Sequence, residues 1–334
     1  MFFSRREFLI ASSGFLFVPA RKKGLIQTVS GKISSKRLGK TLIHEHFLVD
    51  FIGADKLTPD RWNRDRVVKK VLPYLKEARQ AGIKSIFDCT PNFLGRDIEL
   101  LKSLADESGV QIITNTGYYG AVQNKYLPPW AFTETAEQLA QRWISEFEEG
   151  IDSTSVKPGF IKIGVDSATP LSDLHKKLVL AAALTHRQTG LTICSHTGPA
   201  AGAFEQLEII QHVGVRPAAF VWVHAQAEAD KQQLVHAARL GCWVSLDGIG
   251  WGDFDQYADS IALLKAGGLL SRVLISHDAG WFKPDEPEAE FKGYVNIFKE
   301  LFPRLIRKGF DESDFDQLLL INPAEAMSIR IRRK

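Results

Sequence analysis

The stretch Thr41-Leu42-Ile43-His44-Glu45-His46 decides the fold, because it is a short apolar run that ends in two alternating histidines. A run of this length and composition is typical of a buried strand. Similar runs recur along the chain, and longer segments with the apolar spacing of a helix lie between them. The predicted strands are residues 41–50, 85–90, 111–119, 160–166, 192–196, 219–224, 242–247 and 273–278.

The segments between the strands predict helices. In Arg64–Ala81, the clearest of them, Val67, Val71, Leu75 and Ala78 share one face. Eight strand–helix units predict an α/β fold, a (β/α)8 TIM barrel of ~250 residues. An open doubly wound sheet is the alternative, but no glycine-rich phosphate loop follows the first strand. Further helices are predicted at residues 171–187, 231–240 and 260–270, a loop at 280–290 and a closing helix at 309–329.

The composition is that of a folded protein of 334 residues, with 45% hydrophobic and 24% charged residues. It excludes disordered, collagen-like and coiled-coil chains. The formal net charge of +3 is too small and too evenly spread to indicate nucleic-acid binding. Three cysteines cannot build a disulfide framework, and we expect Cys89, Cys194 and Cys242 to be buried as small apolar residues.

Residues 1–20 resemble a twin-arginine export signal. Arg5-Arg6 precedes an apolar stretch at residues 8–18, which ends at the small-residue site Val18-Pro19-Ala20. About 11 apolar residues are too few to cross a bilayer, which takes ~20 in a helix. A basic amphipathic N-terminus with a chance arginine pair is the alternative. The resemblance predicts export by the twin-arginine machinery to the periplasm or beyond. The mature chain is then a single barrel domain at residues 21–334, with no membrane association after signal removal.

Polar side chains gather at the carboxyl ends of the predicted strands, where barrel enzymes keep their reacting groups. His44 and His46 are two residues apart on one strand, so both point into the barrel while Glu45 points outward. Taken singly, such a residue is more often a satisfied polar group than a metal ligand. A set of His, Lys and Asp residues at the ends of five different strands is much harder to obtain by chance. The other strand-end residues are Lys162 on the fourth strand, His196 on the fifth, His224 on the sixth and Asp278 on the eighth.

A bare lysine inside a barrel is costly, and Lys162 therefore needs compensation. One solution is a nearby carboxylate. The other is reaction of the neutral amine with carbon dioxide, which gives a carbamate anion. Four imidazoles and one carboxylate cannot easily hold two divalent ions close together without a bridging anion. A carbamate on Lys162 would supply that bridge, so we expect a binuclear metal centre.

This constellation resembles the phosphotriesterase-like family of the amidohydrolase superfamily, over roughly residues 38 to 327. The resemblance implies that His44 and His46 bind the more buried α metal, and that His196 and His224 bind the more exposed β metal. Lys162, carboxylated by carbon dioxide, would bridge both ions. Asp278 would complete the α site and accept a proton. Zinc is the expected ion, and Mn, Co or Fe would suit the same ligands. The resemblance rests also on short sequence motifs at Leu38–His46, Gly95–Asp97, Asn115–Tyr119, Ile275–Asp278 and Asn322–Ala324.

The resemblance also implies a function. We expect a binuclear metal-dependent hydrolase of small molecules, in which a bridging hydroxide attacks a lactone, a carboxylic ester or a similar carbonyl. A phosphotriesterase is one alternative, and a metal-stabilised binding protein without turnover is another. An amidase acting on a cyclic or N-acyl substrate is a third. Members of the family often dimerise, so the resemblance also suggests a homodimer.

Two places depart from the family pattern. Ala225-Gln226-Ala227-Glu228 follows His224, where relatives carry an acid that supports a proton relay. Gly248 follows Asp247, where relatives place a His or an Arg near the leaving group. We therefore expect neither the phosphotriesterase relay nor the lactonase arginine at the matching positions. The candidate substrate contacts are Tyr119, Trp251 and Trp281.

Overall fold

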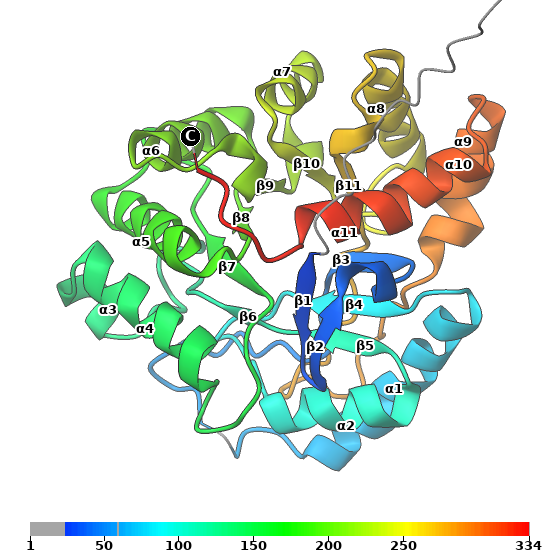
Figure 1. Ribbon diagram of the computed structural model, residues 1–334. Coiled ribbons are helices and arrows are strands. Elements are labelled where there is room, and N and C mark those ends of the chain that lie inside the picture. The colour runs from blue at the N-terminus through cyan, green and yellow to red at the C-terminus, as the bar shows by residue number, and fades with distance from the viewer. Residues whose placement is uncertain (1–23, 59, 334) are drawn as a thin grey trace, which may run out of the picture.

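The computed structural model describes residues 24–58 and 60–333, and the predicted export signal at residues 1–20 lies outside them (Figure 1). No helix in this described part is long and apolar enough to cross a membrane. The described chain begins with an antiparallel hairpin of β1 (Leu25–Thr28) and β2 (Gly31–Ser34), which the sequence pattern did not predict. Val29 lies in the turn of this hairpin. Its backbone N donates to Ile112 O at 2.9 Å, so the hairpin is attached to the third predicted strand.

Parallel strands form the centre of the protein, in two sheets of order β3-β4-β5 and β6-β7-β8-β9-β10-β11. Thr114 separates β5 from β6, which together form the third predicted strand. Beyond the regular pairing the last strand meets the first, where Asp278 N donates to His44 O at 3.0 Å and His46 N donates to Ala279 O at 2.9 Å. The predicted α/β barrel class is confirmed. The strands are β3 (Thr41–Glu45), β4 (Ser85–Asp88), β5 (Gln111–Ile113), β6 (Asn115–Thr116), β7 (Phe160–Gly164), β8 (Ile193–His196), β9 (Phe220–Val223), β10 (Trp243–Leu246) and β11 (Val273–Ile275).

Helices surround these strands (Figure 1). The helices of the seventh and eighth units differ most from the prediction. The helix predicted at 260–270 begins earlier, because Asp253 caps it by accepting from Asp255 N at 2.8 Å. The closing helix is shorter than 309–329, because Gly309 has a φ of +81° and Asp311 caps the new start. The helices are α1 (Arg64–Gln80), α2 (Ile98–Ser108), α3 (Trp130–Thr133), α4 (Ala136–Glu149), α5 (Asp173–Thr189), α6 (Ala200–His212), α7 (Gln232–Leu240), α8 (Phe254–Ala266), α9 (Phe302–Arg307), α10 (Glu312–Asp316), a π-helical segment (Gln317–Ile321) and α11 (Asn322–Ala326).

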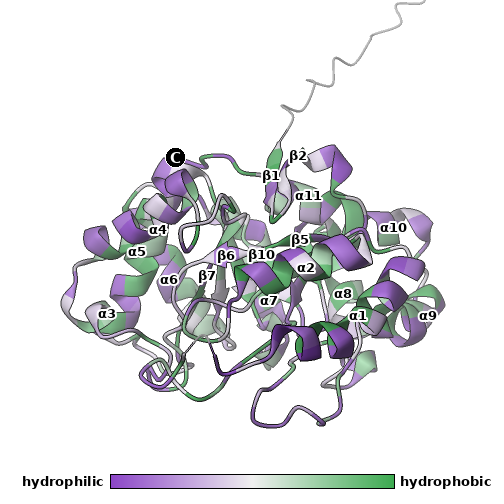
Figure 2. Cartoon of the chain, turned by 90° about the horizontal axis from the view of Figure 1, so that it is seen from below, coloured by the Kyte–Doolittle hydropathy of each residue, from purple (hydrophilic) through white to green (hydrophobic). Residues whose placement is uncertain are grey.

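Apolar side chains fill two large regions and a small third one at Val49, Leu94 and Tyr126. One large region lies between the strands and the helices, whose outer faces are hydrophilic (Figure 2). The other large region fills the barrel interior and includes Ile43, Phe87, Phe160, Val221 and Trp243. Figure 2 also shows the β1–β2 hairpin and α11 at one end of the barrel and long connections at the opposite end. The three cysteines are free and buried, as predicted.

His186 makes the stability of the fold depend on pH. Its Nδ1 lies 2.7 Å from Leu191 O and its Nε2 accepts from Arg332 N at 2.9 Å, an arrangement that requires the neutral ring. Burial lowers the pKa of His186 to about 4. The unfolded chain therefore takes up a proton near pH 6.5 that the folded chain refuses, so folding stability falls as pH decreases from 6.5 towards 4. The contribution of His186 to the free energy of unfolding is up to about 3 kcal/mol.

Denaturant unfolding of His186→Gln, whose side chain can donate and accept without titrating, should show a smaller loss of stability between pH 6.5 and pH 4 than the parent chain. An equal loss in both would contradict this.

Candidate metal centre

The strand ends bring all six predicted ligands to one cavity of ≈ 90 Å³. The side chains of His44 and His46, from the end of β3, and of Lys162, from β7, lie deepest and are buried. Those of His196 and His224 are half-buried. Asp278 keeps 16% of its side chain exposed. Of the three candidate substrate contacts, Tyr119 and Trp281 line the same cavity and Trp251 does not.

Ring nitrogens converge on the carboxylate of Asp278. His46 Nε2 lies 3.0 Å and His44 Nε2 lies 3.5 Å from Asp278 Oδ1. His224 Nε2 lies 3.9 Å from Asp278 Oδ2. Yet Asp278 Oδ1 is buried and forms no hydrogen bond of good geometry within the described residues. One potential ligand atom from each of His44, His224 and Asp278 lies within 4.8 Å of the other two, so these three residues could hold a shared cation.

Asp247 orients two of these rings. This carboxylate, buried at the end of β10, lies with Oδ1 2.8 Å from His224 Nδ1 and Oδ2 3.1 Å from His44 Nδ1. Burial would raise the pKa of Asp247, but the imidazoles of His224 and His44 outweigh it and hold that pKa well below its ordinary value. The hydrogen bond to His224 Nδ1 places the ring proton there and leaves the Nε2 lone pair free, whereas His44 Nδ1 approaches the carboxylate without forming a hydrogen bond in the described chain. Asp247 is thus a functional residue that sequence reasoning missed, although its place at a strand end was the available signal.

Thr90 performs the same task for His46. Its Oγ1 lies 2.8 Å from His46 Nδ1, and its hydroxyl can donate to Leu48 O at 3.0 Å or to Asp88 Oδ1 at 3.2 Å. Because the threonine proton is used there, His46 Nδ1 is the donor and its Nε2 lone pair faces Asp278. The rings of His46 and His224 therefore present unprotonated Nε2 atoms to one place, which is the protonation state that a metal ligand needs.

Gln226 shows what takes the place of the acid that relatives carry after the histidine equivalent to His224. Its side-chain Nε2 donates to Asp247 Oδ1 at 3.3 Å, and its Oε1 accepts from Asp247 N at 3.2 Å. Glu228 points elsewhere, since its Oε2 accepts from Ala200 N at 2.8 Å. The segment thus caps the carboxylate of Asp247 and places no acid of its own beside the rings.

Lys162 is a buried cation without a carboxylate partner. Only 1% of the residue is exposed. Its Nζ lies 3.3 Å from His44 Nε2, and within residues 24–58 and 60–333 it takes part in no ion pair. Burial, and after it the charge of Lys162, lowers the pKa of His44 to about 4. No carboxylate lies within ion-pair distance of this amine in the described chain.

Glu45 fixes the strand that carries two of the histidines. Its side chain points out of the barrel interior, as predicted, and is fully buried. Oε1 accepts from Ser276 Oγ at 2.8 Å and lies 2.7 Å from His277 Nδ1, while Oε2 accepts from Ala279 N at 3.0 Å. These bonds hold β3 against the segment after β11, so the register of His44 and His46 relative to Asp278 is set by one carboxylate.

Aromatic side chains surround the opening of the cavity. Tyr119 OH lies 3.1 Å from His196 Nδ1. Trp281 packs against His46, with ring centroids 5.7 Å apart. Trp251 is half-exposed, packs against Trp281 in a tilted arrangement with ring centroids 5.4 Å apart, and donates from Nε1 to Asp278 O at 2.7 Å. Trp251 therefore contacts the backbone of a predicted ligand rather than the cavity.

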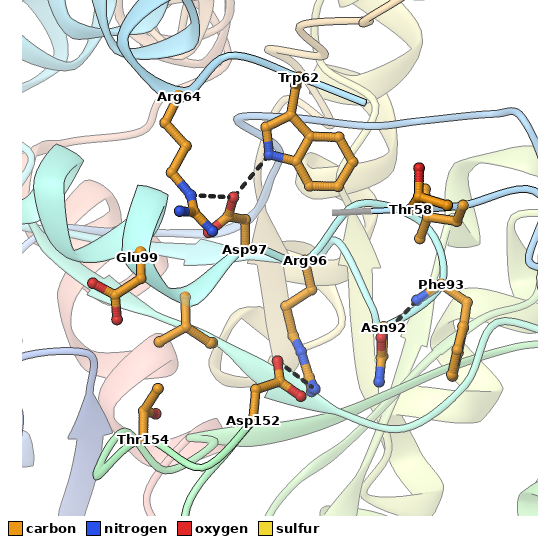
Figure 3. Close-up of a pocket in the computed structure, with 12 residues that line it drawn as sticks. Thr58, Trp62, Arg64, Asn92, Phe93, Arg96, Asp97, Glu99, Asp152 and Thr154 are labelled. Atoms are coloured by element: carbon orange, nitrogen blue, oxygen red, sulfur yellow. Dashed lines mark hydrogen bonds and ion pairs between the residues drawn. The ribbon is translucent and has the colours of Figure 1, made fainter. Parts of the chain in front are cut away.

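A larger cavity of ≈ 430 Å³ lies beside the connections that follow β3 and β4 (Figure 3). There Asp97 accepts from Arg64 Nε at 2.7 Å and from Trp62 Nε1 at 2.8 Å. Arg96 is paired with Glu146 at 2.6 Å. The principal charged side chains of this larger cavity are thus already paired with carboxylates or arginines of the chain. The size of a cavity does not identify the site in this protein, whereas the converging donor groups do.

A sequence model of the phosphotriesterase family matches residues 24–327. The chain belongs to the phosphotriesterase family. The phosphotriesterase homology protein of Escherichia coli K12 is 29% identical over 290 residues, which are 86% of this chain and 97% of that protein. The crystal structure of that relative gives a TM-score of 0.75 and covers 86% of this chain and 98% of its own.

Two other relatives in or near this family carry hydrolase names. The aryldialkylphosphatase of Saccharolobus solfataricus is 28% identical over 308 residues, covering 89% of this chain and 97% of that protein. The human N-acetyltaurine hydrolase is 27% identical over 354 residues, covering 92% of this chain and 99% of that protein. Membership of the phosphotriesterase family makes this chain a metal-dependent hydrolase.

Proposed function

We propose that this chain is a binuclear metal-dependent hydrolase of uncharged, apolar carboxylic esters or lactones. The observation that carries the proposal is the division of the cavity: donor groups form its floor, and side chains without charge form its walls. The donor groups are His44, His46, Lys162, His196, His224 and Asp278, and the walls include Val49, Phe51, Leu94, Tyr119, Val122, Tyr126 and Trp281.

The residues of the floor fit two divalent ions. His44, His46 and Asp278 would hold the deeper ion, and His196 and His224 would hold the outer one. A carbamate on Lys162 would bridge the two, and the absence of an ion pair at this buried amine in the described chain supports that modification. Imidazole and carboxylate ligands suit zinc, and Mn, Co or Fe would fit as well. When bound, the two ions would supply Lewis-acid polarisation and a water of lowered pKa.

Asp278 is the side chain placed to accept a proton during hydrolysis. Burial opposes its ionisation, but the nearby imidazoles of His44, His46 and His224 outweigh that effect and hold the pKa of Asp278 below its ordinary value. Its partly exposed oxygen faces the cavity, so a proton received there can leave to solvent. Tyr119 and Trp281 would orient the substrate from the walls.

The walls favour an uncharged substrate. Within the described lining, Lys162 is the one lysine or arginine, and it lies in the floor with the histidines. An anionic group such as a sulfonate would lose its hydration there without gaining a cationic partner. We therefore expect little hydrolysis of N-acetyltaurine, although relatives at 27% identity are named for that activity.

A phosphotriesterase is the second candidate. A neutral phosphotriester would suit the same apolar walls, and the relative from Saccharolobus solfataricus is named an aryldialkylphosphatase. The acid relay expected of efficient triester hydrolysis is missing, since Gln226 and Gly248 stand at the matching places. We therefore propose esters and lactones, and not phosphotriesters, as the preferred substrates.

A substrate panel tests the proposal. The full chain, loaded with zinc in bicarbonate buffer, is assayed with alkyl lactones, aryl acetates to octanoates, a diethyl aryl phosphate and N-acetyltaurine. We expect the highest kcat/KM for an apolar ester or lactone, at least about tenfold above the phosphotriester. We also expect activity to disappear on chelation and to return with zinc. Highest activity on the triester would establish the second candidate instead. Preference for N-acetyltaurine, or turnover that survives chelation, would contradict the proposal.

A further inference from the structure

The connection after β6 contains an unusual run of backbone conformations. Val122, Gln123 and Asn124 have φ values of +62°, +57° and +63°. Residues other than glycine rarely adopt this left-handed region, and a β-branched residue such as valine does so least. The segment from Gly120 to Tyr126, which we call loop 120–126, must therefore be held in place by contacts from outside it.

Asp166 supplies the principal contacts. Its Oδ1 accepts from Val122 N at 2.7 Å and from Gln123 N at 3.3 Å. His175, on α5, adds two more, because its Nε2 donates to Gly120 O at 3.1 Å and to Asn124 Oδ1 at 3.0 Å. One carboxylate thus satisfies the backbone of the two residues whose conformation is hardest to maintain.

The position of Asp166 in the sequence connects this loop to the metal centre. Lys162, Gly164 and Asp166 are spaced two residues apart along β7 and its extension. A Cβ at Gly164 would lie 2.7 Å from the ring of Tyr119, so the missing side chain makes room for that tyrosine. Gly120 N donates to Gly164 O at 2.9 Å. The strand that carries Lys162 therefore also supports Tyr119 and loop 120–126.

Loop 120–126 forms one side of the cavity. Val122 lines it with 53% of its surface exposed, and Tyr126 lines it beside Tyr119, with ring centroids 5.9 Å apart. Phe51 continues this apolar surface, 6.2 Å from the ring of Tyr126. A displaced loop would remove Val122 and Tyr126 from the cavity and leave the histidines of the floor in place.

We propose that Asp166 is a positioning residue that sets the preference for long apolar acyl groups, by holding loop 120–126 against the cavity. The inference rests on the proposed ester or lactone hydrolysis for its substrate class. Long acyl chains reach Val122 and Tyr126, whereas an acetyl group reaches only the floor. Loss of the Asp166 carboxylate should then weaken binding of long chains and spare short ones.

The variant Asp166→Ala tests this with paired substrates. For an aryl octanoate we expect KM to rise about tenfold, and for the aryl acetate we expect kcat and KM to stay within about twofold, at unchanged metal content. Asp173→Ala is the matched control, because it removes a nearby exposed carboxylate that makes no hydrogen bond to loop 120–126 in the described chain. The double variant Asp166→Ala/Gln123→Gly should recover part of the loss, since glycine adopts positive φ freely.

Two measurements do not need turnover. Trypsin cleavage after Lys125 should accelerate about tenfold in Asp166→Ala and slow again in the double variant. Binding of octanoate, followed by tryptophan fluorescence, should weaken while acetate binding is unchanged. If the parent chain hydrolyses no ester but these two results appear, the proposed function fails and the role of Asp166 stands. Equal losses for acetate and octanoate, or unchanged chain-length preference, would overturn the role of Asp166.

Discussion

Replacement of Lys162 by alanine is expected to lower hydrolysis by more than about 100-fold, beyond the 10–100-fold cost of losing a partner outside the ligand shell. The proposed bridge between the two ions would be gone, and the floor would hold four imidazoles and one carboxylate around two cations. We therefore expect at most one firmly bound metal ion per chain. Elemental analysis of the dialysed variant measures the metal, and the preferred ester measures the activity.

A matched control separates the bridge from general loss of positive charge. Lys157 lies in the connection before β7, where its exposed Nζ donates to Glu148 O at 2.6 Å. Lys157→Ala should keep both metal ions and full activity. Acetate or propionate added to Lys162→Ala should restore part of the activity, because a short carboxylate can occupy the place of the carbamate. Two bound ions in Lys162→Ala without any such additive would contradict a carbamate bridge.

Replacement of Asp247 by alanine should have the next largest effect. The acceptor that fixes the proton on His224 Nδ1 and the carboxylate beside His44 Nδ1 would be gone, so both rings could rotate or change tautomer. Loss of one such partner lowers metal affinity about 10–100-fold, and here two ligands share it. We expect zinc affinity, measured by competition with a chelator, to fall by about 100-fold, with a parallel fall in kcat/KM.

The control for Asp247 is Asp253→Asn. Asp253 lies in the same connection, where its carboxylate caps α8, and it approaches none of the histidines in the described chain. Its replacement should leave zinc affinity unchanged. Asp247→Asn should be intermediate, because an amide oxygen can accept from one ring only. Zinc affinity within twofold of the parent in Asp247→Ala would contradict the orienting role.

The strand ends were predictable because alternation along a strand is a property of the backbone. His44 and His46, two residues apart, were expected to share a face opposed by Glu45. The structure brings both histidines to the cavity and turns Glu45 toward the segment after β11, although the pairing of β3 with β4 shifts register between Leu42 and Glu45. Parallel strands then brought Lys162, His196, His224 and Asp278 to the same end of the barrel without any knowledge of their contacts. The gathering of these side chains thus followed from spacing alone, and their roles as metal ligands stay predictions.

The remaining features depend on contacts between residues far apart in sequence. Asp247 was given no role from the sequence, because the departure from the family pattern lies at its neighbour Gly248 and the distances from Asp247 to His224 and His44 were unknown. Trp251 was predicted to touch substrate, which stays a prediction, but the bond from its indole N–H to Asp278 O could not be read from a pattern in a loop. The left-handed conformation of Val122 has no signal either, since valine does not favour it and Asp166 imposes it from another strand.

The metal content of the purified full chain, reloaded with zinc in bicarbonate buffer, tests the binuclear centre most directly. Elemental analysis should give close to two zinc ions per chain, and chelation should remove both the metal and the ester hydrolysis. A chain that binds no metal after reloading would contradict the centre formed by His44, His46, Lys162, His196, His224 and Asp278.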